Sequence, residues 1–88
     1  MFYVYILYSH KDKKLYVGQT NDLGARVKRH ASGYVDATKH RLPLTCIYSE
    51  QFETRSEAMQ REHFLKSLWS SRFKKKLKDE FELQLRNE

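Results

Sequence analysis

The sequence predicts an α+β fold, in which a small, three-stranded and mainly antiparallel sheet is flanked by helices in the order β-β-α-β-α-α. Two strand-like runs, residues 2–8 and 15–18, are separated only by a short polar turn, which is typical of a β-hairpin. A third strand-like run spans residues 44–52, and helix-start signals precede and follow it. The 88 residues suffice for one domain, so we expect a single domain over residues 1–88.

The hairpin sets the relative positions of two phenols. If the turn at residues 10–14 has an even-length register, Tyr5 lies opposite Gly18 and Leu7 lies opposite Tyr16. Alternation along the strands then puts Tyr5 and Tyr16 on the same face as diagonal neighbours. Gly18 has no side chain, so it leaves space beside them for another backbone or a ligand. Two tyrosines on one face are ordinarily core packing, and that interpretation stays open.

The middle of the chain should contain a helix, a loop and the third strand. Asn21 or Asp22 can cap a helix that Gly33 ends. Residues 34–43 have the polar, mixed composition of a loop. The run at 44–52 follows a proline, which suits the entry to a strand because proline has no N–H to donate.

The last third of the chain should be helical. Residues 54–57 form a capping box, so we expect a helix from there to about Trp69. Ser70 and Ser71 interrupt the pattern, and a basic helix runs from about Arg72 into the eighties. We expect the core of the domain to end near residue 78 and the last turns of this helix to fray.

The first helix carries polar residues where apolar ones are expected. Its inward stripe, which recurs at four-residue spacing, consists of Leu23, Val27 and Ala31. His30 falls between Leu23 and Val27 on the helical wheel, and Arg26 lies at the edge of the same stripe. The two polar residues therefore share one face, one turn apart.

The next helix also has a polar residue, a carboxylate, where an apolar one is expected. Ala58, Leu65 and Trp69 form its inward stripe, and Glu62 projects between them. A buried carboxylate is costly to keep alone, so Glu62 needs a cation, hydrogen-bond donors or water. A salt bridge, for example to Arg26, is the structural interpretation, and a metal ion is the functional one.

Taken together, these polar residues point toward the seam between the sheet and its helices. They supply a proton acceptor, a planar cation and a hard metal ligand, which are the functional groups that hydrolysis of a phosphodiester requires. The set comprises Tyr5, Tyr16, Arg26, His30 and Glu62.

Composition limits the partners and the compartment. Lysine and arginine number 17 against 11 acidic residues, giving a formal net charge of +6, which favours anionic partners such as nucleic acid.

No segment approaches the roughly 20 apolar residues of a membrane helix, and residues 1–8 lack the basic leader of a signal peptide. Cys46 is the only cysteine, which excludes an internal disulfide and fits a cytoplasmic protein. Its apolar surroundings predict a buried side chain.

These residues and their spacing resemble those of the GIY-YIG endonuclease superfamily over about residues 1–78. Residues 4–6 (Val-Tyr-Ile) and 16–18 (Tyr-Val-Gly) match the two tripeptides, with valine in place of glycine in the first and of isoleucine in the second. Residues 21–30 match the helix with its leucine, arginine and histidine, and residues 52–66 match the helix that bears an acidic metal ligand. The sequence is most similar to the stand-alone bacterial URI or YhbQ-like subgroup. That subgroup is similar to the N-terminal nuclease domain of the excinuclease of nucleotide excision repair.

The resemblance implies a role for each of the five polar residues. Glu62 would hold one Mg²⁺ or Mn²⁺, and Arg26 would donate bidentate hydrogen bonds to phosphate oxygens. One phenol would take the proton from the attacking water, and we favour Tyr16, supported by His30, with Tyr5 as the orienting residue. The implied protein is a metal-dependent endonuclease that acts on nucleic acid, with DNA favoured over RNA, in repair or recombination. Because a single small domain makes few phosphate contacts, a protein partner could supply specificity.

Other residues are candidates for contacting the substrate. These are Gly18, Lys39 and His40 near the predicted site, and Lys74 and Lys75 on the last helix. The lysines of that helix are equally consistent with a solvated face. Two other functions remain open. One is a non-catalytic nucleic-acid-binding module with the same fold, and the other is a small basic protein that docks on RNA or protein through its C-terminal helix.

Overall fold

The computed structural model describes residues 1–87 and contains the predicted strands and helices in the predicted order. They are β1 (Phe2–Ser9), β2 (Leu15–Thr20), α1 (Leu23–Ala31), η1 (Lys39–Arg41), β3 (Leu44–Phe52), α2 (Arg55–Lys66), η2 (Leu68–Ser70) and α3 (Ser71–Arg86), where η denotes a short 3₁₀ turn. The strands form one antiparallel sheet in the order β2-β1-β3. The predicted α+β class and topology are therefore confirmed.

The hairpin has the register that the sequence predicts. Tyr5 pairs with Gly18, and Leu7 pairs with Tyr16. The second strand continues to Thr20, two residues beyond the predicted end. The phenols of Tyr5 and Tyr16 consequently share one face of the sheet, as alternation requires.

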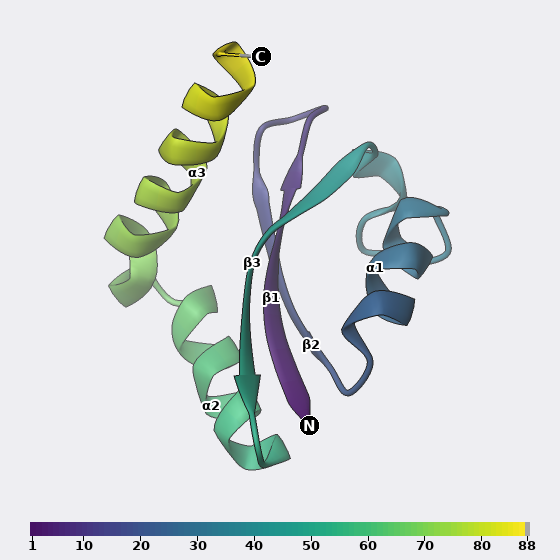
Figure 1. Ribbon diagram of the computed structural model, residues 1–88, viewed down its shortest axis with the longest axis vertical. Coiled ribbons are helices and arrows are strands. Elements are labelled where there is room, and N and C mark those ends of the chain that lie inside the picture. Colours follow the sequence, from purple (N-terminus) through teal and green to yellow (C-terminus); the bar gives the residue numbers. More distant parts are fainter. Residues whose placement is uncertain (88) are drawn as a thin grey trace.

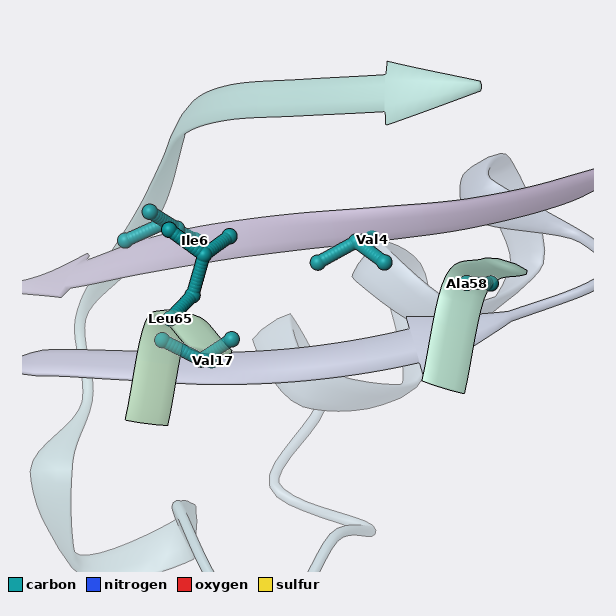
Figure 2. Close-up of a cluster of buried hydrophobic side chains, with 5 residues drawn as sticks. All are labelled: Val4, Ile6, Val17, Ala58 and Leu65. Atoms are coloured by element: carbon teal, nitrogen blue, oxygen red, sulfur yellow. The ribbon is translucent and has the colours of Figure 1, made fainter. Parts of the chain in front are cut away.

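The two faces of the sheet are covered by different helices. Figure 1 shows α2 and α3 along one face and α1 beside the other. The apolar core lies on the α2 face, where side chains of β1 and β2 meet those of α2 (Figure 2). It consists of Val4, Ile6, Val17, Ala58 and Leu65. Burial of this cluster fixes which side chains of β1 and β2 point the other way, toward α1.

The first helix buries a histidine instead of the predicted apolar stripe. Ala31 is exposed, and Leu23 and Val27 are only half-buried. His30 is 1% exposed and is the only fully buried residue of α1. The helix has nine residues and little contact with the sheet, so few of its positions are covered. Burial of His30 is tolerated because both ring nitrogens have hydrogen-bond partners.

The second helix ends three residues earlier than predicted, and Trp69 is not in the core. Thr54 and Glu57 form the predicted capping box at its start. At its end, Ser67 leaves the helical region with φ −90° and ψ 166°. The buried Ser70 hydroxyl then lies 3.0 Å from the carbonyl oxygen of Leu65, to which it donates. The turn that satisfies this carbonyl directs Ser70 inward and leaves Trp69 88% exposed.

The last helix is anchored near its C-terminal end. Tyr8 of β1 donates a hydrogen bond of 2.7 Å to Glu82, and its ring packs on Phe81 at 4.9 Å between centroids. The hydrogen bond to Glu82, together with burial, raises the pKa of Tyr8 to about 12. These contacts tie α3 to β1, and the helix continues to Arg86. The fraying expected of its last turns stays a prediction. None of the helices within residues 1–87 combines the length and the apolar character needed to cross a membrane.

The third strand covers the predicted residues 44–52 and forms an edge of the sheet. Its side chains are half-buried or exposed. Cys46 is accordingly half-buried and not fully buried as predicted, because an edge strand is covered less completely than the central one.

Candidate active site

A buried chain of three side chains forms the centre of the site on the α1 face. The hydroxyl of Tyr5 lies 2.9 Å from His30 Nε2, and His30 Nδ1 lies 2.7 Å from the hydroxyl of Thr38. All three residues are 1% exposed or less. They come from β1, the last turn of α1 and the loop that follows α1, so folding of three segments is needed to assemble them.

The imidazole of this chain is held in its neutral form. Burial lowers the pKa of His30, and the nearby charge of Arg26 lowers it further. A neutral imidazole has one donor nitrogen and one acceptor nitrogen, and each flanking hydroxyl can take either role. The chain from Tyr5 to Thr38 is therefore satisfied in either tautomer.

A guanidinium connects the two phenols. Arg26 Nε lies 3.4 Å from the Tyr5 hydroxyl and donates to it. The pKa of Arg26 is raised, mainly by its hydrogen bond with Tyr5. Burial acts in the opposite direction, and interactions with the charges of both phenols and a hydrogen bond with Tyr16 add to the increase. Burial raises the pKa of the Tyr5 phenol, whereas the hydrogen bond from Arg26 acts in the opposite direction. Arg26 itself is half-buried, so part of its donor set faces water.

The two phenols differ in their access to solvent. Tyr5 is fully buried, whereas Tyr16 is half-buried. The ring of Tyr16 packs against His30 with centroids 5.3 Å apart. The hydrogen bond of His30 goes to Tyr5 and not to Tyr16, so its support of Tyr16 is through ring packing.

The space beside Gly18, which we expected to admit a ligand, is filled by a phenol. A Cβ atom at Gly18 would lie 2.5 Å from the Tyr5 hydroxyl oxygen and 2.6 Å from Cζ. Gly18 is itself buried. Glycine at this position is thus needed for the position of Tyr5.

The carboxylate of Glu62 approaches the sheet from the opposite face. It is borne by α2, and its side chain is 21% exposed. Its Oε1 accepts a hydrogen bond of 3.4 Å from Gln19, and its Oε2 lies 3.3 Å from Lys66 Nζ. Its negative charge contributes to the raised pKa of Tyr5. Its ion pair is with Lys66 and not with Arg26, which corrects the partner suggested by the sequence.

The structure thus brings four of the five predicted residues together and leaves the fifth on the α2 face. Tyr5, Tyr16, Arg26 and His30 contact one another directly or through one neighbour. Glu62 is next to Gln19, whose backbone neighbour Gly18 lies under Tyr5. Edge strand β2 separates the two parts, which interact electrostatically across it.

The donor chemistry of Glu62 fits a hydrated divalent cation. Within residues 1–87 no group of three or more His, Cys, Asp or Glu side chains could enclose a metal ion. Magnesium usually keeps several waters and binds through one or two carboxylates, so a single partly exposed glutamate is a suitable ligand. A fully caged ion, such as structural zinc, does not fit.

The predicted substrate-contacting residues divide between the two faces. Lys39 and His40 are exposed on η1, directly after Thr38, and Lys39 pairs with Asp36 at 3.3 Å. Lys74 and Lys75 belong to α3, on the face that carries Glu62.

Two residues of the site were missed from the sequence. Thr38 lies in a segment that has only a loop pattern, and its burial depends on how that loop folds over His30. Gln19 could have been found from strand alternation, since it follows Gly18 and must point to the face that α2 covers.

Comparisons with known proteins agree on one family. The model of the GIY-YIG catalytic domain matches residues 1–78. A UPF0213 protein of Natronomonas pharaonis is 39% identical over 89% of this chain and 92% of its own length. The UPF0213 protein YazA of Bacillus subtilis is 47% identical over 76% of this chain and 67% of its own length. The solution structure of a UPF0213 protein of Bacillus halodurans matches with a TM-score of 0.53 and 40% identity, covering 88% of this chain and 82% of that one.

Proposed function

Because this chain belongs to the GIY-YIG family, we propose that it is a metal-dependent endonuclease that hydrolyses phosphodiester bonds of nucleic acid. The observation that carries the proposal is the contact of Arg26 with the buried Tyr5–His30 pair, beside the more exposed phenol of Tyr16. A planar cation fixed next to a phenol that water can reach is suited to a reaction in which an oxyanion develops as a water is deprotonated.

In this proposal Arg26 binds the reacting phosphate. Its Nε is engaged by Tyr5, which fixes the plane of the guanidinium. The remaining N–H groups can donate in parallel to two phosphate oxygens, in the geometry that favours arginine over lysine. Charge that builds up on the phosphate would then meet a donor set already in place.

Tyr16 is the proposed general base, and Tyr5 is the residue that orients the site. A base must contact the attacking water, and the half-buried Tyr16 meets this condition, whereas Tyr5 is enclosed by His30 and Arg26. A charge interaction and a hydrogen bond with Tyr16 contribute to the raised pKa of Arg26, so the guanidinium lies close to this phenol. The ring of His30 holds the ring of Tyr16 in position.

Glu62 is the proposed ligand of one Mg²⁺ or Mn²⁺. When bound, such an ion stabilises negative charge on the phosphate and on the leaving oxygen. The contacts of Glu62 with Gln19 and Lys66 are long, at 3.4 and 3.3 Å, which leaves the carboxylate able to exchange a partner. DNA is the proposed substrate in preference to RNA, in repair or recombination, and a partner protein is proposed to supply specificity.

A second candidate function is a non-catalytic nucleic-acid-binding module. The position of Glu62, on the face opposite the phenols and paired with Lys66, favours it. The two functions differ in whether a divalent ion changes the covalent state of the nucleic acid.

The test is cleavage of single-stranded, duplex and branched DNA and of RNA, with Mn²⁺ or with EDTA. We expect cleavage only with Mn²⁺, and loss of at least about a hundred-fold in rate in Glu62→Gln, because the metal ligand is removed. Glu53→Gln, which neutralises an exposed carboxylate just before α2, is the matched control and should cut like the wild type. Equal rates in Glu62→Gln and wild type would exclude the proposed metal ligand, and binding without any cleavage would favour the second function.

A further inference from the structure

The net charge of the chain is concentrated in one segment. Residues 63–78 contain no Asp or Glu, and the other eleven cations of the chain are balanced by its eleven acids. The segment joins the end of α2 to the first half of α3. Its six cations are Lys66, Arg72, Lys74, Lys75, Lys76 and Lys78. The densest run of positive charge along the sequence therefore lies at the α2–α3 junction, where it favours a polyanion.

At the centre of this segment is the only tryptophan, and its ring is uncovered. Trp69 is 88% exposed and its neighbour Leu68 is 90% exposed. The nearby rings of Phe64 and Phe73 are occupied, since the guanidinium of Arg61 stacks on them at 5.2 and 5.6 Å. Trp69 has no aromatic or cation–π partner within residues 1–87. Trp69 and Leu68 together form an apolar surface exposed to water, and contiguous surfaces of this kind mark interaction sites.

The occupant of this surface can be argued from its chemistry. A flat indole face suits a planar ring, and the nearby cations, of which only Lys66 and Lys75 pair with acids within residues 1–87, favour a chain of phosphates. An unpaired nucleotide supplies both, whereas the bases of a duplex are stacked on one another and present only their edges. A basic protein surface would be repelled by the six cations.

We propose that Trp69 is a stacking site for an unpaired base of nucleic acid, whose flanking phosphates are bound by the cations of residues 66–78. The proposal rests on the proposed function for its ligand class and narrows that class to strands with unpaired nucleotides. Glu62 lies on α2, which leads directly into the turn that carries Trp69. A strand stacked at Trp69 would thus be tethered near the proposed metal ligand.

The single tryptophan makes the first test direct. The fluorescence of the wild-type protein is titrated in EDTA with oligothymidylate and with a duplex of the same length. Stacking predicts quenching that saturates with the single strand and is much weaker with the duplex. Equal quenching by both, no quenching, or emission that changes with protein concentration alone would overturn the proposal.

The second test assigns the effect to the ring of Trp69. Binding of a labelled single strand is measured by anisotropy in EDTA for Trp69→Ala, Trp69→Phe and the control Leu68→Ala. We expect Trp69→Ala to weaken binding by about ten-fold or more, Trp69→Phe to restore most of it, and Leu68→Ala to change it little. Equal losses in Trp69→Ala and Leu68→Ala would overturn stacking. Because no cleavage is needed, a protein that proved not to be a nuclease could still pass both tests.

Discussion

The α1 face and the α2 face of the sheet hold their polar residues in opposite ways. On the α1 face Tyr5, His30 and Thr38 are almost fully buried and joined by hydrogen bonds of 2.9 and 2.7 Å. On the α2 face Glu62 stays partly exposed, with contacts of 3.3 and 3.4 Å. A polar group that is fully buried must have fixed partners, whereas a group that exchanges partners must remain near water.

This difference suggests that the two faces contribute differently to the proposed reaction. The α1 face is preorganised, so a change there should affect both geometry and stability. The α2 face is adjustable, so a change there should affect ion binding with little effect on the fold. Substitutions on each face can break or sharpen this contrast.

The largest effect, on the rate of cleavage, is expected when the guanidinium of the α1 face is replaced. Arg26→Lys keeps the charge but loses the fork that contacts Tyr5 and the proposed phosphate. We expect the cleavage rate with Mn²⁺ to fall by about a hundred-fold or more. Arg29→Lys, on the exposed side of the same helix, should cut at the wild-type rate. If the two variants are equally active, Arg26 does not bind the reacting phosphate.

The next effect is on stability and comes from crowding the buried phenol. Gly18→Ala would put a methyl group 2.5 Å from the Tyr5 hydroxyl, so the phenol must leave His30. We expect the free energy of unfolding to fall by about 1–3 kcal/mol, as measured by urea denaturation. The control Gly24→Ala has no atom closer than 3.9 Å and should not be destabilised. A fully stable Gly18→Ala would show that the α1 face is less rigid than the hydrogen bonds indicate.

The same contrast explains what could be predicted from the sequence. The hairpin register follows from alternation, which is a local rule, so the pairing of Tyr5 with Gly18 was predicted correctly. The position of Trp69 depends on Ser70, whose hydroxyl caps the end of α2, and helical periodicity alone cannot show where a helix stops. Thr38 contacts His30 only because of how the loop after α1 folds, and that loop has no periodic pattern from which the contact could be predicted.

The placement of Glu62 shows a further limit. Periodicity correctly placed it beside the inward stripe of α2. Which face of the sheet that helix covers is a tertiary property, set by the apolar side chains of β1 and β2 that α2 buries. The sequence therefore predicted that Glu62 lies beside the buried face of α2, but not where that face lies relative to the phenols.

A smaller effect is expected on the pH dependence of stability. The pKa of His30 is lower in the folded protein than in the unfolded chain, because of burial and then of Arg26. The unfolded chain therefore binds more protons as the pH falls through about 6.5, and the free energy of unfolding should decrease there. Urea denaturation between pH 8 and pH 5 should show this loss, and it should be absent in His30→Gln. The control His63→Gln, exposed on α2, should keep the wild-type profile.

The smallest effect, on metal affinity, is expected on the α2 face, where Lys66 and a divalent ion would compete for the carboxylate of Glu62. Lys66 Nζ lies 3.3 Å from Glu62 Oε2, in a partly exposed pair one helical turn apart. Such pairs stabilise a helix by about 0.3–0.5 kcal/mol. Removing the pair in Lys66→Met should therefore tighten Mn²⁺ binding by roughly two-fold. Electron paramagnetic resonance of free Mn²⁺ measures this affinity. Lys75→Met removes the equivalent pair with Asp79 and should leave Mn²⁺ affinity unchanged, because that pair is borne by α3 and does not involve Glu62. Weaker Mn²⁺ binding in Lys66→Met would mean that the lysine assists the ion instead of competing with it, and the α2 face would then be as preorganised as the α1 face.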